Sequence, residues 1–131
     1  NKCFVCGTEN RNGLRLSFNI DKIEKTLRTT FVPSETYQGW DGIVHGGILS
    51  TLLDEAVAKL AYELGFEALT ARLTVTFRKA AKIGKQLAVF GEITRVTPRI
   101  IEGASRITDT SQNLIAEGEV RLLRVPRLPV S

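Results

Sequence analysis

The chain has few sulfur-containing residues and no long run of apolar residues. It has no methionine and two cysteines, and two cysteines are too few for the disulfide framework of a small secreted domain. No run approaches the roughly 18 apolar residues that a membrane span needs, and no signal-peptide pattern opens the sequence. These absences predict a cytoplasmic protein that has no membrane partner.

Aromatic residues are also scarce, at 7% of the chain, and no helix-turn-helix, zinc-finger or RNA-binding pattern is present. The net charge is nevertheless +4, and the basic residues are dispersed apart from one denser stretch. That basic stretch contains Arg78, Lys79, Lys82 and Lys85. A phosphate-bearing small molecule suits it at least as well as nucleic acid does, and a solvated strand end is the structural alternative. We therefore expect no nucleic-acid partner.

The rest of the composition is typical of a globular protein. Hydrophobic residues make up 43% and charged residues 24%, and a chain of 131 residues is long enough to bury a sizeable core. There is no internal repeat, low-complexity tract or linker. Residues 1–131 are therefore predicted to form a single domain.

Hydrophobic periodicity predicts one helix and six strands. Residues 45–64 carry apolar side chains at helical spacing, and Gly65 follows where a helix commonly ends. Alternating or apolar segments bounded by turn residues predict strands over 14–20, 26–32, 71–79, 86–97, 100–108 and 113–125. The order β-β-α-β-β-β-β with short connections predicts an α+β domain, in which an antiparallel sheet packs against a single helix.

Asp54 lies away from the apolar stripe of the predicted helix. At about 100° per residue it falls roughly 140° from the centre of the stripe. The small residues that share its side are Gly47, Ser50, Ala58 and Ala61. A carboxylate among small residues suggests that something packs closely there, and an exposed aspartate on a polar helix face is the alternative.

Gly46 and Gly47 fall in the first turn of the helix, where backbone N–H groups lack intrahelical acceptors. Without side chains in the way, a carbonyl or an anion can approach these donors, as in the oxyanion site of an acyl-transfer enzyme. A Gly-Gly pair that merely lets another backbone segment pass closely is the alternative.

Gly46 and Asp54 cannot act on one carbonyl from the same helix. Eight residues separate them, which is about 12 Å along the helix axis, whereas both groups must lie roughly 3 Å from the reacting group. Two antiparallel copies of the helix solve this problem. If this stretch is an active site, the protein is predicted to be a two-fold dimer with two shared sites.

His45 is the only histidine of the chain. At the N-terminus of a helix, the nearby N–H groups disfavour the imidazolium, and a ring nitrogen can cap the first turn. No Ser or Cys nucleophile lies beside it in the sequence. We therefore favour a structural or substrate-contacting role for His45 over that of a catalytic base.

Cys3 and Cys6 form a C-x-x-C-G pattern with Gly7. A closed zinc site needs four ligands, and the chain offers two cysteines and a histidine that already has a predicted role. The interpretation from the sequence is a pair of packed or half-exposed thiols, with no metal site and no cofactor. A metal shared across a dimer is the remote alternative.

The motifs together resemble those of the hot-dog-fold acyl-CoA thioesterases, above all the phenylacetate-pathway type. Residues 42–48 read G-I-V-H-G-G-I and residues 52–56 read L-L-D-E-A, on the only predicted helix. Residues 3–7 and the 70–77 strand are also similar to segments of such proteins. The resemblance implies an antiparallel sheet of about six strands around one long central helix. It also implies a thioester hydrolase that acts on acyl-CoA as a dimer or a dimer of dimers, with coenzyme A present only as part of the substrate.

The resemblance also implies roles for individual residues. Asp54 would be the general base or nucleophile, and the N–H of Gly46 in the partner subunit would bind the thioester oxygen, with His45 and Gly47 in support. Thr70 matches a position where some members use a hydroxyl to orient water. The residues expected to contact the CoA phosphates are Arg78, Lys79, Lys82 and Lys85.

One position departs from the family pattern. Some members carry Asn or Gln about six residues before the histidine, where this chain has Gly39. The neighbouring Gln38 is the candidate for that role. A hydratase or dehydratase on the same fold and a non-catalytic acyl-CoA-binding protein are the alternative functions.

Overall fold

The computed structural model describes residues 2–11 and 13–125. Its elements are β1 (Asn19–Asp21), β2 (Thr26–Phe31), a short 3-10 helix η1 (Glu35–Tyr37), α1 (Gly46–Glu63), β3 (Ala68–Phe77), β4 (Leu87–Val96), β5 (Ile100–Asp109) and β6 (Leu114–Arg124). The predicted order β-β-α-β-β-β-β is confirmed. That the whole chain forms one domain stays a prediction.

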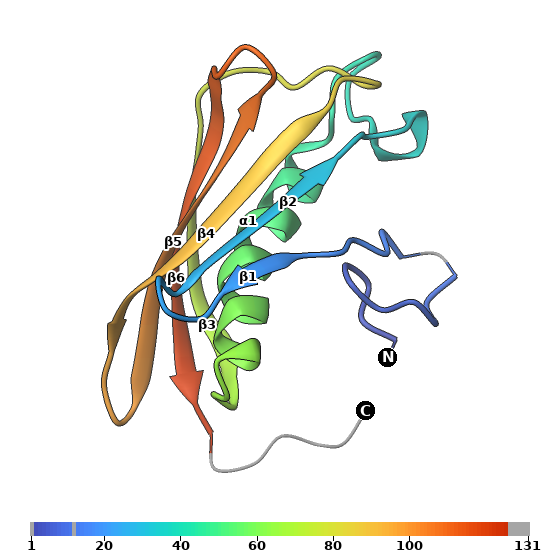
Figure 1. The fold of residues 1–131 in the computed structure, drawn as a ribbon. Coiled ribbons are helices and arrows are strands. Elements are labelled where there is room, and N and C mark those ends of the chain that lie inside the picture. Colours follow the sequence, from blue (N-terminus) through green and yellow to red (C-terminus); the bar gives the residue numbers. More distant parts are fainter. Residues whose placement is uncertain (1, 12, 126–131) are drawn as a thin grey trace.

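The six strands form one antiparallel sheet in the order β1-β2-β4-β5-β6-β3. The sheet curves around α1, which lies along its concave face (Figure 1). This is the predicted hot-dog fold. Although β3 follows the helix directly in sequence, it pairs with the last strand, β6, and so lies at one edge of the sheet.

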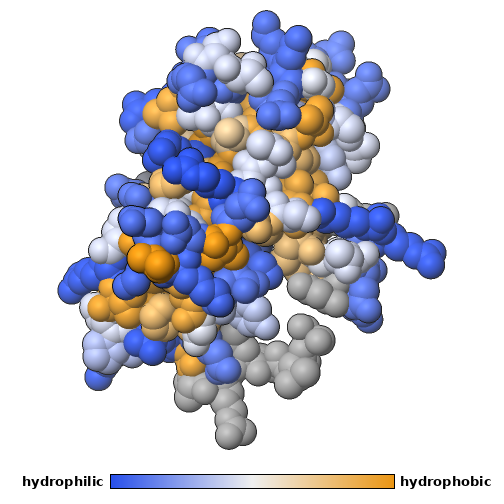
Figure 2. Space-filling model, in the orientation of Figure 1, coloured by the Kyte–Doolittle hydropathy of each residue, from blue (hydrophilic) through white to orange (hydrophobic). Residues whose placement is uncertain are grey.

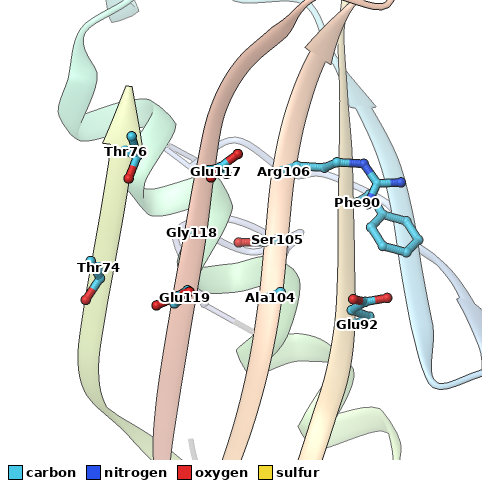
Figure 3. Close-up of a pocket in the computed structure, with 10 residues that line it drawn as sticks. All are labelled: Thr74, Thr76, Phe90, Glu92, Ala104, Ser105, Arg106, Glu117, Gly118 and Glu119. Atoms are coloured by element: carbon cyan, nitrogen blue, oxygen red, sulfur yellow. The ribbon is translucent and has the colours of Figure 1, made fainter. Parts of the chain in front are cut away.

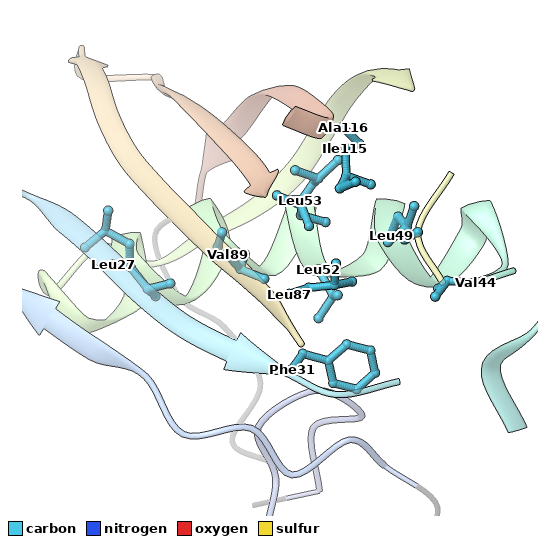
Figure 4. Close-up of a cluster of buried hydrophobic side chains, with 14 residues drawn as sticks. Leu27, Phe31, Val44, Leu49, Leu52, Leu53, Leu87, Val89, Ile115 and Ala116 are labelled. Atoms are coloured by element: carbon cyan, nitrogen blue, oxygen red, sulfur yellow. The ribbon is translucent and has the colours of Figure 1, made fainter. Parts of the chain in front are cut away.

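The apolar stripe of α1 forms the centre of the core. Leu49, Leu52 and Leu53 point from the helix toward side chains of the surrounding strands and loops (Figure 4). Their partners in this cluster include Leu27, Phe31, Leu87, Val89, Ile107 and Ile115. The helix is therefore held by burial of its predicted face.

Ala61 corrects one detail of the predicted helix surface. The helical projection placed Ala61 on the side of Asp54, away from the core, but Ala61 is buried in a second cluster with Ile101, Val120 and Leu122. The sheet curves far enough for β5 and β6 to cover this side of the last helical turns. The rest of that side stays accessible, since Gly47 is exposed and Ser50, Asp54 and Ala58 are half-buried.

Small residues of the sheet let α1 approach closely. A Cβ atom on Gly91 would overlap the backbone carbonyl of Ala56. The buried Ser105 hydroxyl donates a 2.8 Å hydrogen bond to the backbone carbonyl of Leu53. These contacts hold the helix in place within two residues of Asp54.

The predicted strand over 14–20 is wrong in extent, because only residues 19 and 20 of it belong to β1. The Leu14 N–H donates to the Phe4 carbonyl at 2.6 Å and the Leu16 N–H donates to the Val5 carbonyl at 2.7 Å. Leu14 and Leu16 nevertheless pack against the core. The alternation identified the inward side chains, but the backbone partner is the N-terminal segment rather than β2.

None of the helices in the part of the chain that the structure describes is long and apolar enough to cross a membrane. Hydrophilic side chains predominate on the face shown in Figure 2, with apolar side chains in smaller groups between them.

Candidate functional site

His45 is the N-cap of α1. Its Nδ1 accepts a 2.8 Å hydrogen bond from the backbone N–H of Gly47. A nitrogen that accepts a hydrogen bond carries no proton, so the proton of the neutral ring is on Nε2. His45 therefore holds the first helical turn and presents one N–H donor on an exposed side chain.

The N–H of Gly46 has no hydrogen-bond acceptor among the described residues. It lies in the first turn of α1, where the helix dipole favours negative charge. An open hollow of about 420 Å³ adjoins it, lined by Gly39, Trp40, Ile43 and His45, among others. The geometry leaves this donor available to a carbonyl oxygen.

Phe77 is a neighbour of Gly46 that the sequence did not reveal. A Cβ atom on Gly46 would lie 3.3 Å from Cζ of the Phe77 ring. Phe77 is the last residue of β3 and is 53% exposed. The ring thus packs beside Gly46, and the alternation of β3 was the only signal that it faces the helix.

Asp54 is half-buried on α1 and accepts a 2.7 Å hydrogen bond from the Thr70 hydroxyl at its Oδ1. Its Oδ2 receives no hydrogen bond from any described residue. This carboxylate is therefore oriented through one oxygen and accessible through the other.

A β-bulge brings Thr70 to Asp54. Strict alternation along β3 would place Thr70 on the same side as Arg72 and Thr74, facing away from the helix. The register with β6 shifts between Thr70 and Arg72, so Ala71 is the extra residue. The bulge reverses the alternation and directs the Thr70 hydroxyl toward α1.

Gly46 and Asp54 lie on the same helix, α1. The expected separation of about 12 Å along the axis therefore applies. The structure brings Thr70 to Asp54 and Phe77 to Gly46, but it does not bring Gly46 and Asp54 of one chain together.

The basic stretch lies at the Gly46 end of the helix. Ile43 and Lys82 form an isolated β-bridge, and the Ile83 N–H donates to the Gly42 carbonyl at 3.0 Å. Arg78 pairs with Glu117 at 3.1 Å. Lys82 and Lys85 are exposed.

Gln38 lies in the loop before the helix. Its Oε1 accepts a 3.1 Å hydrogen bond from the Gly42 N–H, which holds the loop that lines the hollow. The side-chain NH2 group makes no hydrogen bond to the other described residues, so it is available as a donor.

A second cluster of polar side chains lies beside this helix. Cys3 and Cys6 of the N-terminal segment meet Glu55, and the ligand atoms of the three side chains lie within 4.8 Å of one another. Burial and the negative charge of Asp54 raise the pKa of Glu55. Burial is also the main cause that raises the pKa of Cys6 to about 11. The sequence held no signal that Glu55 joins the two cysteines, since 52 residues separate Cys3 from Glu55.

A different hollow, of about 310 Å³, lies on the outer face of the sheet (Figure 3). Its charged lining comes from Glu92, Arg106, Glu117 and Glu119. None of the predicted site residues lines it. The hollow next to Gly46 is therefore the better candidate for a ligand.

A model of the thioesterase superfamily matches residues 41–116. Acyl-coenzyme A thioesterase THEM4 of Mus musculus is 27% identical over 96 residues, which make up 73% of this chain and 41% of that protein. The chain thus spans less than half the length of this curated relative.

Solved structures share the fold at lower identity. The thioesterase superfamily protein RHA08564 has a TM-score of 0.86 at 24% identity, over 93% of this chain and 60% of that chain. Smu.793 from Streptococcus mutans, bound to acetyl CoA, has a TM-score of 0.82 at 17% identity, over 94% of this chain and 98% of that chain. The PaaI protein of the E. coli phenylacetic acid degradation operon has a TM-score of 0.77 at 19% identity, over 84% of this chain and 79% of that chain.

Proposed function

The chain belongs to the thioesterase superfamily, and we propose that it hydrolyses acyl-CoA to free CoA and a carboxylic acid. The observation that carries this proposal is that α1 holds both groups the reaction needs. Asp54 accepts a hydrogen bond from Thr70 of β3, and the Gly46 N–H of the same helix has no acceptor among the described residues. Support comes from the mouse relative, an acyl-coenzyme A thioesterase, and from the similar structure that holds acetyl CoA.

The proposed active unit is a two-fold dimer formed through β3. This edge strand has 10 residues and carries exposed Leu69 and Phe77. A long exposed edge strand invites pairing with another strand. Antiparallel pairing of two β3 strands would extend the sheet and set the two helices side by side, with Asp54 of one subunit facing Gly46 of the other. A dimer of such dimers is the larger assembly that the family resemblance implies.

In the proposed reaction, the Gly46 N–H of one subunit and the Asp54 carboxylate of the other lie on opposite sides of the thioester carbonyl. The Gly46 N–H donates to the carbonyl oxygen and stabilises its developing negative charge. Asp54 of the partner subunit, oriented by Thr70, removes a proton from water, and the resulting hydroxide adds to the carbonyl carbon. The C–S bond then breaks, and the CoA thiolate takes the proton from Asp54. Direct attack by Asp54, followed by hydrolysis of the anhydride, is the other route that the same geometry permits.

The remaining side chains would bind and orient the substrate. The His45 Nε2–H and the Gln38 NH2 group are donors close to the Gly46 hollow. Lys82 and Lys85 would contact the CoA phosphates. We expect a smaller contribution from Arg78, because its guanidinium already pairs with Glu117, and Lys79 would add positive charge at the same end.

A thiol-release assay tests this proposal. Purified protein would be incubated with short-chain, long-chain and aromatic acyl-CoAs, and free CoA would be measured with a thiol reagent. Turnover of at least one class supports the proposal. Binding of acyl-CoA without release would favour the non-catalytic alternative, and water addition to an enoyl-CoA without release would favour a hydratase.

Loss of the Thr70 hydroxyl is expected to lower kcat. Thr70→Val removes a hydrogen bond to a charged carboxylate, and such a bond is worth about 1.5–3 kcal/mol, so we expect kcat to fall by about ten- to a hundredfold. Thr70→Ser retains the hydroxyl and should recover most of the activity. If Thr70→Ser is as impaired as Thr70→Val, the hydroxyl does not orient Asp54.

Loss of the His45 side chain is expected to lower stability mainly, and turnover to a smaller extent. His45→Ala removes the N-cap and should lower the free energy of unfolding by about 1 kcal/mol, as measured by urea denaturation. His45→Asn supplies another capping side chain and should restore stability. Turnover of His45→Ala should exceed that of Asp54→Asn, and the reverse ranking would identify His45 as the base.

A further inference from the structure

The cluster of Cys3, Cys6 and Glu55 lies outside the proposed reaction. Adjacent helical residues point about 100° apart, and the side chains of Asp54 and Glu55 meet different partners. Asp54 contacts Thr70 of β3, whereas Glu55 Oε2 lies 3.9 Å from the Cys3 sulfur of the N-terminal segment. The cluster is therefore a separate feature on the neighbouring side of α1.

The N-terminal segment presents its two thiols from a turn that is anchored on both sides. The Cys3 carbonyl accepts a 2.9 Å hydrogen bond from the Gly7 N–H, which closes the turn around Cys6. Val5, between the cysteines, is 3% exposed, and its carbonyl accepts the Leu16 N–H. Both sulfurs thus come from a fixed turn, and the carboxylate comes from a rigid helix.

The charges of the three ligands would suit a divalent cation once both thiols have lost their protons. Lys59 acts electrostatically on both Cys6 and Glu55, but its ammonium group also pairs with Glu63 at 3.0 Å. A divalent ion that displaced both thiol protons would balance the resulting two thiolates and carboxylate, which one shared lysine could not do.

We propose that Cys3, Cys6 and Glu55 bind one Zn²⁺ ion, with water at the fourth position. Zn–S bonds of about 2.3 Å and a Zn–O bond of about 2.1 Å place tetrahedral ligand atoms roughly 3.5–3.8 Å apart. The three ligand atoms already lie within 4.8 Å of one another, so small side-chain rotations suffice. Two thiolates select zinc over magnesium or calcium. Binding forms two Zn–S bonds and one Zn–O bond, and the two thiol protons pass to solvent.

The sequence predicted no metal site because a closed zinc site needs four ligands, and the chain offered two cysteines and a histidine that already had a predicted role. The third ligand comes from α1, and it became visible only in the folded chain. Bound zinc would tie the N-terminal segment to the helix that carries Asp54. This assignment does not depend on the proposed hydrolysis, because its readout is metal binding.

Cobalt substitution tests the site directly. The full chain would be kept reduced with a phosphine, stripped with a chelator and titrated with Co²⁺, followed by Zn²⁺. We expect one Co²⁺ per chain, a thiolate-to-cobalt charge-transfer band with tetrahedral d–d bands, and loss of both when Zn²⁺ displaces the cobalt. A wild-type protein without the charge-transfer band would overturn the proposal, whatever the variants do.

Variants assign the ligands. Cys3→Ser and Cys6→Ser should each lose most of the charge-transfer intensity, and Glu55→Gln should lower zinc affinity by at least about tenfold. Glu67→Gln, a matched change at an exposed glutamate beyond the helix, should bind zinc as the wild type does. Equal affinity of Glu55→Gln and the wild type would overturn the three-ligand site. So would a Cys3–Cys6 disulfide that re-forms under the phosphine and excludes the metal.

Discussion

Asp54→Asn is expected to lower kcat for acyl-CoA hydrolysis by at least about a thousandfold, the scale of a lost general base. Asparagine has nearly the shape of aspartate and can still accept the Thr70 hydrogen bond, so the fold and the dimer should persist. It can neither take a proton from water nor attack the thioester. The measurement is thiol release at saturating acyl-CoA, together with size-exclusion chromatography.

Glu63→Gln is the matched control for this change. It removes a carboxylate from the same helix, where Glu63 pairs with Lys59 at 3.0 Å, and its activity should stay close to that of the wild type. Full activity of Asp54→Asn would exclude the carboxylate as base and as nucleophile.

Gly46→Pro is expected to lower kcat by about 10²–10³-fold, the cost of losing one oxyanion donor. Proline removes the backbone N–H, and it is well tolerated at the first position of a helix. The preceding His45 has φ −60° and ψ 132°, an extended conformation that suits the residue before a proline. The change therefore removes the donor and leaves the helix start intact.

Gly46→Ala distinguishes the effect of losing the N–H donor from the effect of crowding at position 46. Alanine keeps the N–H but adds a Cβ atom 3.3 Å from Cζ of Phe77, and the half-exposed ring has room to shift. We expect Gly46→Ala to retain much more activity than Gly46→Pro. Equal losses in the two variants would indicate that crowding against Phe77, rather than the missing N–H, lowers the rate.

Mixing the two inactive variants tests whether the site is shared. In a heterodimer of Asp54→Asn and Gly46→Pro subunits, one site combines an intact Gly46 with an intact Asp54. Random mixing by co-expression should therefore restore about a quarter of wild-type activity, since half of the dimers are mixed and each has one intact site. A site contained in a single subunit would remain inactive in every combination.

The elements could largely be predicted from the sequence, because hydrophobic periodicity is a local property. The spacing of leucines over 45–64 predicted α1 to within one residue at each end, and alternation identified β3 to β6 with shifts of at most three residues at their ends. The first strand was the exception, since its backbone partners are in the N-terminal segment. The candidate roles of Gly46 and Asp54 came from helix geometry and the family resemblance, and they stay predictions.

Hydrophobic periodicity was enough to predict the central helix, the order of helix and strands along the chain, and the positions of Gly46 and Asp54 on one helix, because each depends on neighbouring residues. Tertiary structure alone decided which residues meet them. The bulge at Ala71 turns Thr70 toward Asp54, and the sheet order leaves β3 at an edge. The N-terminal turn likewise brings Cys3 and Cys6 to Glu55. The Thr70–Asp54 and Cys3–Glu55 contacts join residues 16 and 52 positions apart, and periodicity along the chain carries no information about such distant partners.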